Sequence, residues 1–208
     1  MVGYSFGSFI TLELARIMEE SGMTGNVVVI DGAPVFLKQL SYGHISSEVT
    51  DESIQLMLII AIIQNIFPLE NPDELLLKLR ECSTWEAKVD KLIQFGKSQA
   101  EYSEEYMRSI TQAMYNRLKT VFEFDTEHVQ KIKSPITLIR PTEVAFVEIE
   151  EDYELSRFTE GPVTLKFIEG DHTSMLDNSK LADIINDCDP YLQSDRSFQA
   201  YVLSGKNT

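Results

Sequence analysis

The spacing of apolar residues changes along the chain, from helix–strand alternation to a helical block and back. Between residues 7 and 20 apolar side chains recur every three or four positions, as in an amphipathic helix, and Gly22 follows as a stop signal. Residues 26–30 form a β-branched run that ends at the turn residues 31–34. A continuous apolar strand followed by a turn indicates a buried parallel strand.

The middle of the chain, residues 49–127, contains no convincing strand pattern. The apolar periodicity there predicts four helices, at about 51–66, 73–81, 85–97 and 103–122. The second begins with a cap and a first-turn proline at Asn71-Pro72. Ser83-Thr84-Trp85-Glu86 fits a capping box at the start of the third. We interpret the block as a helical lid inserted between strands. Its most apolar run is interrupted by polar residues, so no membrane span is expected.

Strand patterns return at residues 135–140 and 163–168, and a last helix is expected near 179–192. Strands that alternate with helices favour an α/β fold with a parallel sheet. Three clear strands and a two-residue stub at the start are few for this class. We therefore expect a partial α/β domain over residues 1–193 whose N-terminal strands are missing, and a loosely ordered tail over 194–208.

Composition excludes several function classes. The chain has 33 acidic and 18 basic residues and a net charge of −15, which disfavours nucleic-acid binding because phosphates need basic partners. Cys82 and Cys188 are far apart and form no metal-binding cluster. Because no secretory leader opens the chain, we expect reduced thiols, a cytoplasmic protein and no bound metal.

The segment Gly3-Tyr4-Ser5-Phe6-Gly7 matches the G-x-S-x-G pattern of a nucleophile elbow. In such an elbow the serine lies in a sharp turn between a strand and a helix, and small neighbours let the two elements approach closely. The expected helix follows at once. Its N-terminus would present the N–H of Phe6 to a developing oxyanion.

Two further residues complete a candidate triad in the chain order serine, acid, histidine. His172 follows the strand at 163–168 and would act as the general base. The acid has two candidates, because Asp31 and Glu143 each follow a predicted strand. We favour Asp31, since Gly32 and Pro34 make a tight turn that can fix a carboxylate.

The remaining polar candidates have simpler interpretations. His44 and His128 lie without a partner pattern and are read as surface histidines. Asp171 is adjacent to His172, and we expect it to bind the backbone of its own turn. Four apolar residues of the helical block are candidates for the wall of an acyl groove, with ordinary core packing as the alternative: Met57, Ile62, Ile66 and Phe67.

With these motifs in hand, the chain resembles the thioesterase domain that ends animal-type fatty acid synthases, insect ones among them. The resemblance rests on the elbow, on Val29-Ile30-Asp31-Gly32-Ala33-Pro34, on Ile168-Glu169-Gly170-Asp171-His172 and on the segment 152–157. It implies an α/β-hydrolase fold with a triad of Ser5, Asp31 and His172. It also implies that strands and a second oxyanion donor normally precede the elbow.

The resemblance implies hydrolysis of a long-chain fatty acyl thioester, carried on the phosphopantetheine of an acyl carrier protein in the same polypeptide, and release of the free fatty acid. No cofactor of its own is implied. Tethering would let an acidic enzyme serve an acidic carrier, because effective concentration replaces attraction. The alternatives are a stand-alone type II thioesterase of polyketide or peptide synthesis, and an inactive truncated fragment that at most binds acyl groups.

Overall fold

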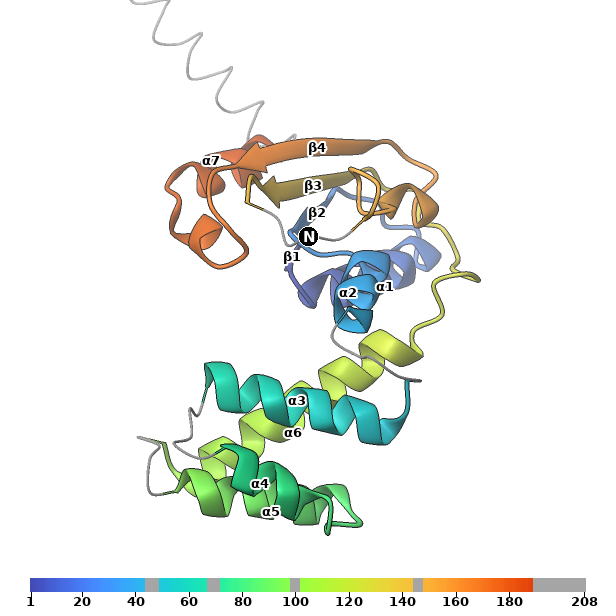
Figure 1. Ribbon diagram of the computed structural model, residues 1–208. Coiled ribbons are helices and arrows are strands. Elements are labelled where there is room, and N and C mark those ends of the chain that lie inside the picture. Colours follow the sequence, from blue (N-terminus) through green and yellow to red (C-terminus); the bar gives the residue numbers. More distant parts are fainter. Residues whose placement is uncertain (44–48, 67–71, 98–101, 144–147, 189–208) are drawn as a thin grey trace, which may run out of the picture. The chain divides into compact units, whose positions relative to one another are not determined.

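The computed structural model describes residues 1–43, 49–66, 72–97, 102–143 and 148–188, and the chain divides into two compact units (Figure 1). One unit, here the sheet unit, combines Met1–Leu40 with Asp125–Thr208. The other, the helical unit, is the continuous segment Ser41–Phe124. The segment interpreted from the sequence as a lid therefore forms a compact body of its own.

Within the described residues, the sheet unit is built on four parallel strands in the order β1-β2-β3-β4. They are β1 (Val2–Tyr4), β2 (Val27–Ile30), β3 (Ile136–Pro141) and β4 (Val163–Ile168). All four residues of β2 are buried, because β2 has a neighbouring strand on each side and both of its faces are covered. The expected α/β class with a parallel sheet is confirmed.

The strand register places the candidate residues at one edge of the sheet. Tyr4, the last residue of β1, is paired with Ile30, the last residue of β2, and Ile30 is paired with Ile139 of β3. Ser5 and Asp31 come directly after the first two of these residues. Because the strands are parallel and end in step, the turns that follow them lie next to each other.

In the described part of the chain, three α-helices belong wholly or mainly to the sheet unit: α1 (Gly7–Glu20), α2 (Pro34–Tyr42) and α7 (Lys180–Asp187). Helix α1 has the expected bounds, packs against β1 and β2, and buries Phe9, Leu12 and Ala15. Helix α2 differs from the expectation, because Ala33-Pro34 was interpreted as a turn. Proline suits the first helical turn, where an N–H has no partner within the helix, and α2 begins at Pro34.

The helical unit contains α3 (Asp51–Asn65), α4 (Pro72–Leu79), α5 (Trp85–Gly96) and α6 (Glu104–Glu123). These bounds agree with the predicted ones within about two residues, which is the usual uncertainty of helix ends. The cap of α5 differs from the capping box expected over residues 83–86: the N-cap is Thr84, whose hydroxyl accepts from the amide of Ala87 at 3.2 Å. A reciprocal capping box formed by Thr50 and Ser53 starts α3.

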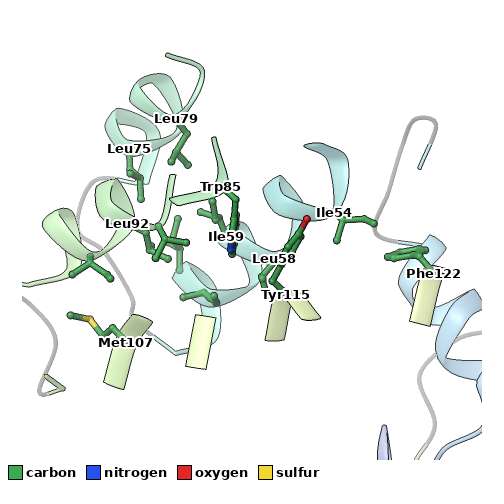
Figure 2. Packing of buried hydrophobic residues seen from close by; sticks show 14 residues of the cluster. Ile54, Leu58, Ile59, Leu75, Leu79, Trp85, Leu92, Met107, Tyr115 and Phe122 are labelled. Atoms are coloured by element: carbon green, nitrogen blue, oxygen red, sulfur yellow. The ribbon is translucent and has the colours of Figure 1, made fainter. Parts of the chain in front are cut away.

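The four helices enclose one apolar core, seen in Figure 2. Leu58, Ile59 and Leu75 have no exposed surface, and the ring of Trp85 stacks on Tyr115 with 4.5 Å between centroids. The indole N–H of Trp85 donates to Gln112 at 2.8 Å, so its polar group is satisfied.

Among the helices that the structure describes, none is both long and apolar enough to cross a membrane.

Candidate active site

Ser5 occupies the sharp turn between β1 and α1, with a φ of 53°. Its amide donates to the carbonyl of Ile30 at 2.9 Å, and its carbonyl accepts from Ser8 at 3.0 Å. A positive φ is unfavourable for a residue with a Cβ, so neighbouring contacts must hold this conformation. Ser5 therefore has the backbone geometry of a nucleophile elbow.

The two glycines of the elbow differ in their surroundings. A Cβ at Gly3 would lie 2.2 Å from the hydroxyl of Thr11 and 2.5 Å from the carbonyl of Gly7, so Gly3 allows α1 to pack closely on β1. A Cβ at Gly7 meets no described atom within 4 Å. The steric reason expected from the sequence thus holds for Gly3 and not for Gly7.

Asp31 follows β2 and is also held at a positive φ, 40°. It is 3% exposed, and its amide donates to Ile139 at 2.8 Å. A Cβ at the next residue, Gly32, would lie 2.3 Å from the carbonyl oxygen of Ser5. Gly32 thus lets the acid turn and the nucleophile turn touch through their backbones, which brings the Asp31 carboxylate close to the serine.

His172 lies in the turn after β4, which Asp171 organises. The Asp171 carboxylate accepts from the amides of Thr173 and Ser174 at 2.9 and 2.8 Å, as expected from the sequence. Bonds from the amide and hydroxyl of Ser174, with the Thr173 amide, lower the pKa of Asp171. The ring of Tyr4 stacks on the His172 ring with 4.8 Å between centroids, and the Tyr4 hydroxyl donates to the His172 carbonyl at 2.7 Å.

The three turns bring Ser5, His172 and Asp31 into one hydrogen-bonded line. His172 Nε2 lies 3.1 Å from Ser5 Oγ, and His172 Nδ1 lies 2.6 Å from Asp31 Oδ2. The carboxylate accepts at Nδ1, which places the ring proton there and leaves Nε2 as the acceptor for the serine proton. The side chain of Asp31 is 4% exposed and that of His172 is 45% exposed, so the acid is shielded while the base faces solvent.

The other acid and histidine candidates lie elsewhere. Glu143 is exposed, and its amide donates to the carbonyl of Gly170 at 2.9 Å; the carboxylate bonded to His172 is that of Asp31. His128 is 86% exposed in its side chain and pairs with Asp125 at 3.0 Å. His44 lies outside the described residues.

The acyl-groove candidates belong to the helical unit and have different environments. Ile62 has no exposed surface and lies in the core of that unit, which is the alternative interpretation given above, so it offers no surface to a ligand. Met57 and Ile66 are partly buried against the same core. Phe67 lies outside the described residues.

One hydrogen-bond partner of the acid was not anticipated from the sequence. Tyr153 is completely buried, and its hydroxyl donates to the second carboxylate oxygen of Asp31, Oδ1, at 2.8 Å. The segment 152–157 carried part of the family resemblance, but nothing in its pattern connects Tyr153 to Asp31, which is 122 positions away.

The described part of the chain contains no group of three or more histidine, cysteine, aspartate or glutamate residues that could hold a metal ion.

The sequence matches the thioesterase-domain family over residues 1–192. The chain belongs to the thioesterase-domain family. The helices and the parallel sheet of this thioesterase domain agree with the α/β-hydrolase-like fold of solved thioesterases.

Among solved structures, the thioesterase domain is similar to part of a four-domain nonribosomal peptide synthetase bound to AMP and glycine, with 16% identity and a TM-score of 0.62 over 91% of this chain and 14% of that one. The type II thioesterase of the borrelidin biosynthetic cluster matches with 19% identity and a TM-score of 0.51, over 90% and 63%. Human thioesterase 2 matches with 14% identity and a TM-score of 0.52, over 93% and 72%. The chain thus spans less than two thirds of the first two proteins.

Proposed function

We propose that the protein hydrolyses acyl thioesters with Ser5 as nucleophile, His172 as general base and Asp31 as the acid that orients His172. One observation carries this proposal: the continuous line from Ser5 Oγ through both ring nitrogens of His172 to the buried Asp31 carboxylate. A serine hydroxyl is a weak nucleophile until a base takes its proton, and this line supplies the base and fixes its tautomer.

In the first half-reaction His172 Nε2 takes the proton of Ser5 as Oγ attacks the thioester carbonyl carbon. The resulting oxyanion would accept from the N–H of Phe6, at the N-terminus of α1. The C–S bond then breaks, His172 gives its proton to the leaving sulfur, and an acyl-serine remains. In the second half-reaction His172 activates a water that attacks the ester, and the free acid leaves as Ser5 recovers its proton.

The finer proposal is that the substrate is a long-chain fatty acyl group on the phosphopantetheine of an acyl carrier protein, within a fatty acid synthase of the cytoplasm. The D-G-A-P and E-G-D-H turns around Asp31 and His172 support it, because they carry the resemblance described above. Met57 and Ile66 of the helical unit are the described candidates for contact with the acyl chain.

A type II thioesterase of polyketide or peptide synthesis is the second candidate. The similarity in fold to the borrelidin-cluster enzyme favours it. Substrate choice separates the two proposals: a synthase domain is expected to prefer a long-chain acyl thioester, and a type II enzyme of peptide synthesis is expected to prefer an aminoacyl thioester.

Release of free thiol from a long-chain acyl-CoA, followed with a thiol reagent, tests the reaction. Ser5→Ala should abolish release. Asp31→Asn should lower kcat by about 10⁴-fold, by analogy with loss of the acid in other serine triads. Glu143→Gln is the matched control and should keep the wild-type rate, because another carboxylate binds His172. Equal rates for wild type and Ser5→Ala would remove the enzymatic proposal and leave an acyl-binding module.

A further inference from the structure

A second side-chain hydrogen bond reaches the acid of the site, at the carboxylate oxygen that does not face His172. Asp31 Oδ2 faces His172 Nδ1 at 2.6 Å, and Asp31 Oδ1 accepts from the hydroxyl of Tyr153 at 2.8 Å. Both oxygens of a carboxylate that is 3% exposed are therefore satisfied by side chains of this unit. A buried carboxylate needs such partners, because loss of one leaves an oxygen without water to replace it.

The Tyr153 ring is held on both faces. The Phe36 ring stacks on it with 3.9 Å between centroids and 7° between planes. The Arg140 guanidinium lies over the ring at 4.4 Å from the centroid, and Arg140 also donates to the carbonyl of Glu151. The ring thus has little freedom to turn away from Asp31.

The backbone of Tyr153 has an unfavourable conformation. Tyr153 and Glu154 have φ values of 55° and 59°, both in the left-handed region. The Asp152 carboxylate holds this turn by accepting from the amides of Glu154 and Ser156 at 2.9 and 3.0 Å. Left-handed residues with a Cβ are uncommon and tend to persist where function requires them.

We propose that Tyr153 is a positioning residue of this site, whose hydroxyl fixes the Asp31 carboxylate in the orientation that faces His172. The inference rests on the proposed function for its effect on turnover, but not for its effect on the histidine. The pKa of Tyr153 is raised, mainly by burial and further by the negative charge of Asp31 and the hydrogen bond to it. The hydroxyl therefore stays protonated and acts as the donor.

The test is Tyr153→Phe, which keeps the ring between Phe36 and Arg140 and removes the hydroxyl alone. Without this donor the negative charge of Asp31 acts more fully on the His172 ring. Among the residues that the structure describes, Tyr4, Ser5, Asp31 and Asp171 interact with this ring. The variant leaves all four in place, so a change in the titration of the ring reports the lost bond.

Two measurements follow. The NMR signal of the proton on Cε1 of His172, assigned with His172→Gln, should follow the titration of the ring. In Tyr153→Phe its midpoint should move to higher pH by roughly 0.5 to 1 unit. In hydrolysis of a long-chain acyl-CoA, kcat should fall roughly 10- to 100-fold at unchanged KM, the size expected for a hydrogen bond to a charged group. The acidic limb of kcat/KM should shift with the midpoint.

Tyr115→Phe is the matched control, because Tyr115 is a buried tyrosine of the helical unit whose hydroxyl accepts from Gln55 at 3.4 Å. It should leave the midpoint and kcat unchanged. An unchanged midpoint in Tyr153→Phe, even with a lower melting temperature, would mean a merely structural role and overturn the proposal. Absence of Ser5-dependent hydrolysis in the wild type would instead overturn the proposed function, and the NMR titration would still decide the role of Tyr153.

Discussion

Replacing Gly32 by alanine places a methyl group where the backbone of Ser5 already lies. The added Cβ would be 2.3 Å from the carbonyl oxygen of Ser5 and 2.9 Å from its carbonyl carbon and its Cα. Ordinary contact begins at 3.4 Å, so the acid turn and the nucleophile turn must separate by about 1 Å. The atoms that must move are backbone atoms tied to β2, since the Ser5 amide donates to Ile30.

The expected cost follows from this geometry. Inserting a methyl group into a packed site typically costs about 1 to 3 kcal/mol, and we expect the upper end because no flexible side chain can give way. A displacement of about 1 Å at reacting groups lowers the rate by on the order of 100-fold. Gly32→Ala should therefore lose about 3 kcal/mol of local stability and about 100-fold in kcat/KM.

Hydrogen exchange measures the loss of local stability at strand β2. The amides of Val27 and Val28 donate to Pro135 and Met1, so their exchange reports opening of β2. A loss of about 3 kcal/mol corresponds to roughly 100-fold faster exchange.

Gly7→Ala is the matched control within the same elbow, because its added Cβ meets no described atom within 4 Å. Alanine favours a helix over glycine by up to about 1 kcal/mol, so Gly7→Ala should leave exchange in β2 unchanged or slow it. Equal acceleration by Gly7→Ala and Gly32→Ala would refute the steric reasoning.

Two further predictions concern stability. Burial alone raises the pKa of Glu19, but bonds from the Ser134 hydroxyl and from two backbone amides outweigh it and hold the pKa below its ordinary value. The stabilising contribution of Glu19 is thus full above about pH 4.5 and is lost as the pH falls through the lowered pKa. In urea unfolding, Glu19→Gln should be less stable than wild type by about 1 to 2 kcal/mol at pH 7, and this difference should shrink as the pH falls below about 4.5. Leu58→Ala should lower the free energy of unfolding of the helical unit by about 2 to 5 kcal/mol in urea unfolding followed by Trp85 fluorescence, whereas Leu77→Ala, at a site 63% exposed, should not. The same loss in Glu19→Gln at neutral and at acidic pH would refute the first prediction, and the same loss in Leu58→Ala and Leu77→Ala would refute the second.

Periodicity predicted most of the elements because their apolar positions repeat clearly. Helix α1 and strand β4 have their predicted bounds, since each shows its own period from end to end. Helix α2 was not predicted, because its start at Pro34 follows Gly32-Ala33 and looks like a turn. Local signals at that point favoured a turn, and packing in the sheet unit selected the helix.

The site was predictable where the chemistry follows a strand end. Asp31 and His172 each come after a predicted strand, and Ser5 follows a segment that was expected to be only a two-residue stub and that forms β1. A parallel sheet brings such turns to one edge. Tyr153 lies in an irregular turn between β3 and β4, with no period and no glycine to mark its left-handed φ. Its contact with Asp31 arises from three-dimensional packing, which local sequence patterns do not encode.

The pairing of β2 with β3 has a consequence for the order of folding. Val27 is paired with Ile136, and the intervening chain includes all of the helical unit Ser41–Phe124. Closing a loop of roughly a hundred unstructured residues has a higher entropic cost than closing the short connections within the helical unit. We therefore expect the helical unit to form early from nearby contacts and to shorten the effective loop, so that the serine, acid and histidine turns meet only in the last stage of folding.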